Sequence, residues 1–116
     1  IVAFLPDAER ENMIEHLTLR AMTPRTLTSK ETLRQELARV QEHGYAIDDE
    51  ETFIGVRCVA APIRDSSNNV IAAMGISGPG SRVTIESLPE LGQRVRTLAD
   101  EFSYSLGARR ELSDQR

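Results

Sequence analysis

The chain has 116 residues, of which 40% are hydrophobic and 28% charged, the size and composition of one globular domain. Its formal net charge of −4 argues against a surface that binds DNA or RNA through phosphate contacts. No apolar run approaches the ~20 residues of a membrane-spanning helix, and a single cysteine excludes an internal disulfide framework. These features predict a cytoplasmic domain that has no membrane partner.

The opening of the chain predicts the end of one helix and the whole of a second. Residues 1–5 are expected to be the last turn of a helix that Pro6 ends. Asp7 is a candidate N-cap for the next helix, which should end near Leu19. Because the chain starts on an apolar run without methionine, we expect it to begin in mid-element, with the opening part of its domain missing.

A third helix is predicted after a proline- and threonine-containing loop. Ser29 is its candidate N-cap, and Gly44 can supply the left-handed residue that ends it. Leu33, Leu37 and Val40 follow at spacings of four and three, which is typical of one apolar face of an amphipathic helix.

The middle of the chain predicts strands. Residues 45–47 form a short strand candidate that leads into four acidic residues, 48–51, read by default as a solvated turn. Residues 53–63 are rich in valine and isoleucine, and residues 70–77 form a second apolar run. The Asp-Ser-Ser-Asn-Asn turn between them, residues 65–69, makes an antiparallel hairpin the simplest arrangement. A Gly-Pro-Gly run is expected to end the second strand.

The last predicted element is a long amphipathic helix. Thr84 or Ser87 caps it, its apolar residues keep a spacing of three and four, and Gly107 ends it. The domain is therefore expected to cover residues 1–107, followed by a polar tail over residues 108–116.

The hairpin has a register that brings its small residues together. A four-residue loop places Asp65 opposite Val70, and the same register then sets Cys58 opposite Ser77. A loop longer by one residue would turn one strand over and separate that pair.

One face of this hairpin is lined by small and partly polar side chains. On the predicted register the face carries Val56, Cys58, Ala60, Gly75 and Ser77. Small residues leave space for a ligand, and a thiol and a hydroxyl offer it polar contacts. The alternative is that small residues let a helix pack closely on the sheet.

The sequence resembles a known family in this region. Residues 44–65, GYAIDDEETFIGVRCVAAPIRD, followed by VIAAMGISGPGSRVT, are similar to the C-terminal effector-binding domain of IclR-type (isocitrate lyase regulator) bacterial transcription factors. The resemblance covers the chain from Ala3 to Gly107. Its most specific part is the order and spacing of the acidic run, the Gly-Val-Arg-Cys quartet and the Ser-Gly-Pro turn.

The resemblance implies a GAF-like α+β (α/β) domain, an antiparallel sheet flanked by helices, that binds a small organic-acid effector against the sheet. The matching positions are Asp48, the apolar wall residue Val56, Cys58, Gly75 and Ser77. Some members have serine at the Gly75 position, so glycine removes a hydroxyl and enlarges the site. The resemblance also implies a homodimer or tetramer, and DNA binding through an N-terminal winged helix-turn-helix outside this chain.

The competing hypothesis is a GAF-like redox enzyme or sensor that uses Cys58 as nucleophile. No second cysteine can resolve an oxidised Cys58, and no histidine adjoins it in sequence to act as base. Four adjacent carboxylates suggest a metal, but the only histidines, His16 and His43, fall on predicted helices away from them. We therefore predict a sensing domain without catalytic residues, bound metal or cofactor.

Overall fold

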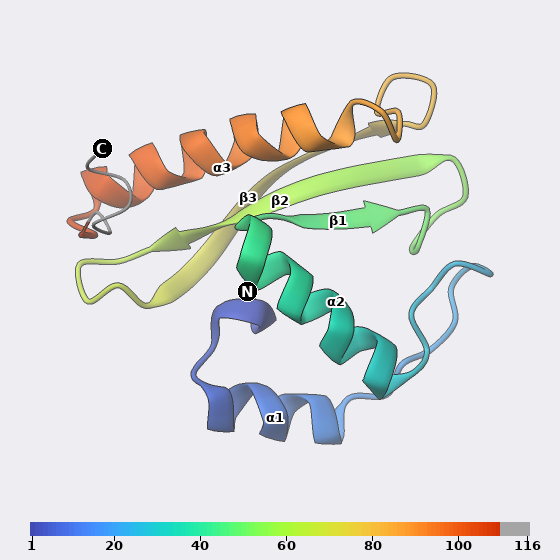
Figure 1. Cartoon of the computed structure of the whole chain (residues 1–116), viewed down its shortest axis with the longest axis horizontal. Helices are drawn as coiled ribbons and strands as arrows, with labels where there is room; N and C mark the ends of the chain where they lie inside the picture. Colours follow the sequence, from blue (N-terminus) through green and yellow to red (C-terminus); the bar gives the residue numbers. More distant parts are fainter. Residues whose placement is uncertain (110–116) are drawn as a thin grey trace.

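A computed structural model of the chain describes residues 1–109 (Figure 1). In this range a short 3₁₀ turn and two helices precede an antiparallel sheet, and a long helix follows it. The elements are η1 (Val2–Phe4), α1 (Asp7–His16), α2 (Lys30–His43), β1 (Ala46–Asp49), β2 (Val56–Arg64), β3 (Val70–Pro79) and α3 (Leu88–Ser105). The predicted α+β class is confirmed.

The sheet has the order β1-β2-β3, with β2 antiparallel to both neighbours. Cys58 lies opposite Ser77 and Ala60 lies opposite Gly75, so the predicted register of the hairpin is confirmed over most of its length. β1, predicted at residues 45–47, extends to Asp49 and so includes half of the acidic run.

The turned end of the hairpin differs from the prediction. Arg64, rather than Asp65, lies opposite Val70, and the register shifts by one residue next to Ile63. Asp65 instead organises the turn, because its Oδ1 accepts hydrogen bonds from the backbone N–H of Ser67 and Asn69. The extra residue is absorbed as a β-bulge, which leaves the pairing of the central residues unchanged.

Both long strands have boundaries that differ from the prediction. β2 begins at Val56 rather than at residue 53, because Gly55 adopts a left-handed conformation (φ 85°) and Phe53 is exposed in the turn before it. β3 continues through Gly78 and Pro79, where the sequence predicted a break. Proline is tolerated there because it ends a strand that pairs on one side only.

α1 is shorter than predicted and is not capped by a side chain. Pro6 occupies the N-cap position and Asp7 is already helical, so the expected Asp7 cap is wrong. The helix ends at His16 rather than near Leu19. The N–H of Leu17 bonds to the carbonyl three residues back, and the backbone then becomes extended, which tightens and closes the last turn.

α2 has the boundaries that the sequence predicted. The hydroxyl of Ser29 accepts a hydrogen bond from the N–H of Thr32, and Gly44 ends the helix with φ 81°. The N–H of Gly44 donates to the carbonyl of Val40. The last helical turn predicted over residues 1–5 is a single 3₁₀ turn.

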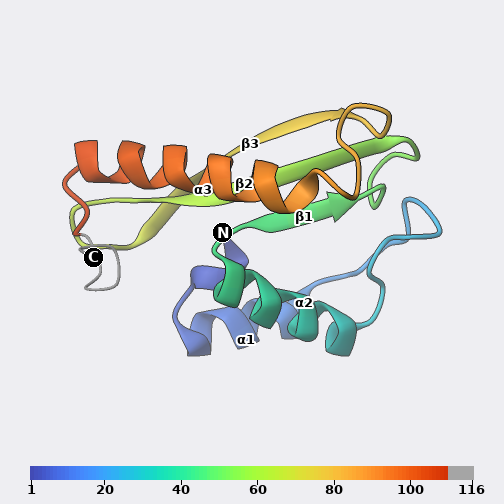
Figure 2. The same ribbon diagram turned by 45° about the horizontal axis from the view of Figure 1, so that its top comes forward.

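The hydrophobic core lies between α3 and one face of the sheet. Figures 1 and 2 show α3 along the sheet, with α1 and α2 beyond the β1 edge of the sheet. The side chains that β2 directs toward α3 are almost fully buried, as are those that α3 directs back. They are Val59, Ala61, Ile63, Leu88, Val95 and Ala99. Within residues 1–109, no helix is long and apolar enough to cross a bilayer.

α3 begins where the sequence predicted, but the contact made by its N-cap residue differs from the expected one. Ser87 holds the N-cap position without accepting from the helix, because its hydroxyl accepts from the N–H of Thr84 and donates to the Thr84 carbonyl. The helix runs to Ser105, close to the predicted end at Gly107. Most of the predicted polar tail, from residue 110 on, lies outside the described residues.

Candidate functional site

Three of the predicted site residues form one row across the sheet. Cys58 on β2 lies between Asp48 on β1 and Ser77 on β3, each directly opposite it in the antiparallel pairing. Residues that are directly opposite point to the same side of a sheet. The register therefore brings a carboxylate, a thiol and a hydroxyl together on one face.

This face is the one that α3 leaves uncovered. Alternation along β2 puts Val56, Cys58 and Ala60 on the side opposite the buried Val59. Gly75 joins the same face through its pairing with Ala60. All five predicted positions, including Val56 and Gly75, thus share one surface, which becomes more exposed from Cys58 to the edge strand β3.

Asp48 already uses both of its carboxylate oxygens. Oδ1 accepts from the backbone N–H of Glu51 at 2.8 Å, and Oδ2 accepts from the hydroxyl of Thr52 at 3.0 Å. The carboxylate therefore shapes the turn after β1 and is held in a defined orientation beside Cys58. Its position is set before any ligand arrives, which limits the ordering that binding would require.

The surroundings of Cys58 raise the pKa of its thiol and so favour the neutral form. Burial raises the pKa of Cys58, the nearby Asp48 charge raises it further, and a hydrogen bond with Ser77 acts in the opposite direction. A raised thiol pKa means less thiolate at neutral pH, and thiolate is the reactive form. The row thus presents Cys58 as a hydrogen-bonding thiol rather than as a nucleophile.

We expect Cys58 to react with iodoacetamide more slowly at pH 7.5 than a small thiol such as glutathione, because less of it is thiolate. The Asp48→Asn variant should react faster than the parent, since removing the negative charge lowers the Cys58 pKa. Alkylation rates measured by mass spectrometry between pH 7 and 9.5 test this, with the urea-unfolded chain as control. A folded-state rate equal to that of glutathione at pH 7.5 would contradict it.

Asp49 and Glu50, which the sequence placed in a solvated turn, are paired with arginines. Asp49 accepts from Arg57 at 2.8 Å and from Arg25 at 3.0 Å, and Glu50 lies 3.5 Å from Arg57. Arg57 also donates to the carbonyls of Gly80 and Val83. It points to the α3 side of the sheet, opposite to Cys58, and ties the acidic turn to the segment that precedes α3.

The other acidic residue of the run, Glu51, is half-buried, and burial raises its pKa. Its carboxylate accepts from the backbone N–H of Asp49 rather than reaching toward the row. Within residues 1–109, no three histidine, cysteine or acidic side chains come together in a way that could hold a metal ion.

Sequence reasoning missed how the loop before α2 contacts the acidic turn. The hydroxyl of Thr23 donates to the carbonyl of Glu50 at 2.6 Å, and the hydroxyl of Thr26 donates to that of Glu51. Arg25 adds its ion pairs from the same loop. The only signal was the Thr-Pro-Arg-Thr run, whose hydrogen-bonding residues fall in a segment expected simply to be a loop.

The fold and the row of side chains define an α+β domain with a pre-formed polar face. Residues 1–104 match the family of C-terminal domains of the bacterial transcriptional regulator IclR. The chain belongs to this family, which confirms the resemblance found in its sequence.

Curated relatives and solved structures support the same family assignment. The repressor AllR of Salmonella typhi, an HTH-type transcriptional repressor, is 38% identical over 103 residues, which cover 89% of this chain and 38% of AllR. The Thermotoga maritima IclR structure has a TM-score of 0.87 at 36% identity, covering 92% of this chain and 43% of that one. The Agobacterium tumefaciens repressor BlcR has a TM-score of 0.85 at 31% identity, covering 94% and 44%. The chain therefore spans less than half the length of these relatives.

Proposed function

We propose that this chain is the effector-sensing domain of a bacterial transcriptional repressor and that it binds a small organic acid on the open face of the sheet. The observation that carries the proposal is the row of Asp48, Cys58 and Ser77 on the one sheet face that α3 does not cover. Val56 and Gly75 complete the surface as an apolar wall and a position without a side chain.

The chemistry of the row favours an acid that also carries a hydroxyl. Ser77 and the neutral thiol of Cys58 can donate hydrogen bonds to the effector's carboxylate. Asp48 places a carboxylate at one end of the row, and a second carboxylate beside it would be repelled. A hydroxyl donor on the effector would instead satisfy the remaining lone pairs of Asp48.

Relatives support this ligand class and the regulatory role. One solved structure, with a TM-score of 0.78 at 26% identity, is a double mutant of the inducer-binding domain of the PobR transcription factor from Acinetobacter in complex with 3-hydroxybenzoic acid. The curated relatives are named as HTH-type transcriptional repressors. We infer that DNA binding belongs to an N-terminal winged helix-turn-helix outside this sequence and that the regulator acts in the cytoplasm.

Effector binding would then be read out through a change in assembly or conformation. A ligand shifts such an equilibrium only by its difference in affinity for the two states. We propose a homodimer or tetramer as the assembled form, because two-fold assemblies match paired DNA half-sites. Catalysis is not part of the proposal, since the raised pKa of Cys58 and its solitary place in the sequence disfavour the redox alternative.

A thermal-shift screen of the purified protein against hydroxy acids, oxo acids, sugar acids and hydroxybenzoates tests the proposal. A ligand at about 100 times its Kd adds ~2.7 kcal/mol of stability, a clear rise in Tm. The rise should shrink strongly in Ser77→Ala and in Asp48→Asn, which keeps one carbonyl acceptor. It should persist in Ser67→Ala, which removes an exposed hydroxyl from the β2–β3 turn.

Two results would overturn the proposal. One is that no acid in any of these classes raises the Tm. The other is a rise that survives both Ser77→Ala and Asp48→Asn, which would place the acid elsewhere on the protein. A stabilising reaction with peroxide in the absence of any acid would favour Cys58 chemistry instead.

A further inference from the structure

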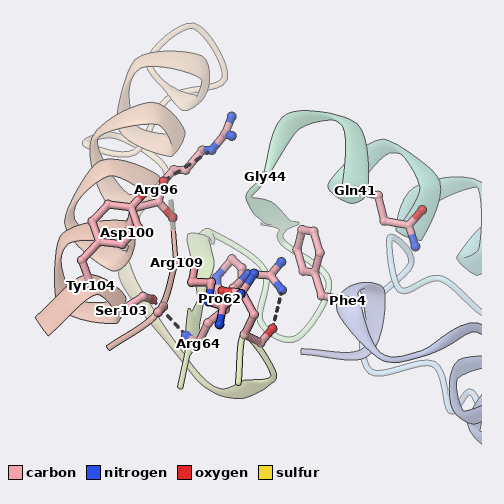
Figure 3. A pocket seen from close by; sticks show the side chains of 12 residues that line it. Phe4, Gln41, Gly44, Pro62, Arg64, Arg96, Asp100, Ser103, Tyr104 and Arg109 are labelled. Carbon is pink, nitrogen blue, oxygen red and sulfur yellow. Dashed lines mark hydrogen bonds and ion pairs between the residues drawn. The ribbon is translucent and has the colours of Figure 1, made fainter. Parts of the chain in front are cut away.

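A polar cavity lies at the other end of β2 from the row. It has a volume of about 110 Å³ and is lined by residues from the N-terminal segment, β2, the β2–β3 turn and α3 (Figure 3). Arg64, on its wall, is six residues along β2 from Cys58, which separates the two places by roughly 20 Å along the strand. The cavity is thus distinct from the proposed effector site.

The cavity is lined by more positive than negative charge. Arg64, Arg96 and Arg109 contribute three guanidinium groups, and Asp100 contributes one carboxylate. This excess of positive charge is local, because the whole chain carries a net charge of −4. Guanidinium groups are the usual protein partners of phosphate and carboxylate oxygens.

Arg64 is held in place by contacts that leave its charge available. The guanidinium of Arg64 lies over the Phe4 ring, 5.0 Å from its centroid, and Nη1 donates to the Asn68 carbonyl at 3.2 Å. Within residues 1–109, no carboxylate lies within ion-pair distance of Arg64. A cation already fixed by an aromatic ring and a carbonyl loses little freedom when an anion binds.

Arg96 has a different role from Arg64. Its Nη1 donates to the carbonyl of His43 at the end of α2, and its Nε lies 4.0 Å from Asp100. Arg96 therefore holds the end of α2 against α3 as well as lining the cavity. Its replacement would disturb packing, so Arg64 and Arg109 are the residues that test binding cleanly.

An unsatisfied acceptor lies beside these arginines. The side-chain oxygen Oδ1 of Asn68 is buried and has no hydrogen-bond partner among the described residues. Asn68 lines the same cavity, and its left-handed backbone (φ 65°) fixes where its side chain starts. A buried acceptor without a donor is costly, and a ligand that brings an O–H group to it would remove that cost.

We propose that this cavity binds a tetrahedral oxyanion that retains a proton, either inorganic hydrogen phosphate or the phosphate group of a small monoester. Its charged oxygens pair with Arg64 and Arg109, while its P–O–H donates to Asn68. The cavity has room for the ligand, because about 110 Å³ is several times the ~10–15 Å³ that one water molecule requires. Sulfate has the same shape but no proton at neutral pH, so it pairs with the arginines and leaves Asn68 unsatisfied.

Calorimetric titration of the purified protein with inorganic phosphate at pH 7.5 and constant ionic strength tests this. Saturable binding is expected, with sulfate about tenfold weaker because it lacks the donor. Arg64→Gln and Arg109→Gln should each weaken phosphate binding about tenfold, which is what the loss of one charge-assisted hydrogen bond commonly costs. Arg94→Gln, an exposed arginine of α3 that does not line this cavity, is the matched control and should bind as the parent does.

The proposal is overturned if phosphate binding does not saturate, or if Arg94→Gln weakens it as much as Arg64→Gln does. If Arg64→Gln fails to fold, the effect of Arg109→Gln on phosphate affinity tests the proposal. Glycerol phosphate and inorganic phosphate, both titrated at pH 5.5 where each keeps a proton, distinguish the two sources, and the tighter of the two names the ligand class. Ser77→Ala should leave phosphate binding unchanged, which separates this site from the proposed effector site.

Discussion

Gly92→Ala is expected to lower the free energy of unfolding by roughly 2 kcal/mol, and hence the Tm by roughly 10 °C. Gly92 is buried on α3 against the ring of Tyr45, and a Cβ built there would lie 2.4 Å from Cε2 of that ring. Tyr45 is itself 5% exposed within the core cluster, so its ring has little room to move.

The direction of the stability change in Gly92→Ala distinguishes steric overpacking from helix propensity. Glycine to alanine in the middle of a helix ordinarily stabilises by about 1 kcal/mol. Overpacking a core costs up to ~3 kcal/mol, so the steric cost at Gly92 should outweigh the helical gain. Urea unfolding of Gly92→Ala, with the exposed neighbour Gln93→Ala as control, measures the difference. A stabilised Gly92→Ala variant would show that Tyr45 does not pack as the structure has it.

A double-mutant cycle tests whether contact with the Tyr45 ring causes the loss of stability in Gly92→Ala. Tyr45→Val removes the ring that the new methyl group would meet. Gly92→Ala should therefore cost much less in the Tyr45→Val background than in the parent, with a coupling of at least ~1 kcal/mol. Equal costs in both backgrounds would assign the effect to some other contact of Gly92.

Gly75→Ser is expected to destabilise the protein by roughly 2 kcal/mol, although Gly75 is exposed and serine suits a strand edge. A Cβ on Gly75 would lie 2.5 Å from the carbonyl oxygen of Val59 and 3.0 Å from the Cβ of Ala60. These atoms belong to the paired strand β2, largely to its backbone, and cannot move aside as the end of a flexible side chain can. Introducing serine would therefore require β3 to shift relative to β2.

Ala73→Ser is the matched control for Gly75→Ser. Ala73 lies two residues away on the same face of β3 and is exposed, so the added hydroxyl should change stability by less than ~0.5 kcal/mol. Thermal unfolding of both variants tests the difference. Equal stabilities would mean that β3 accommodates a side chain at residue 75 without cost. Glycine there would then be a simple loss of a hydroxyl, as the sequence alone suggests.

The hairpin shows why part of this site was predictable. Alternation in a strand has a period of two, and the polar turn limits the possible loop lengths, so the pairing of Cys58 with Ser77 followed from local patterns. The bulge next to Ile63 was not predictable in the same way. It arises because Asp65 hydrogen-bonds to the backbone inside the turn, and several turn geometries offer such a bond.

The contacts of the acidic run, in contrast, were not predictable from local patterns. Nothing in the spacing of Arg25, Asp49 and Arg57 indicates that two arginines meet one carboxylate. Arg25 reaches Asp49 only because Thr23 and Thr26 bind the loop to carbonyls of the turn. The cavity lined by Arg64, Arg96 and Arg109 is likewise assembled from segments that are distant in the chain.

The sequence by itself determined the α+β class, the register at the centre of the hairpin, the caps of α2 and the family, because each depends on residues that are close in the chain or on motifs in order. The tertiary structure decided which face of the sheet α3 covers and hence that Asp48, Cys58 and Ser77 remain accessible. It also decided that Gly75 and Gly92 are needed for close approach and that three arginines meet at one cavity. These features depend on packing between distant segments, which one-dimensional patterns do not encode.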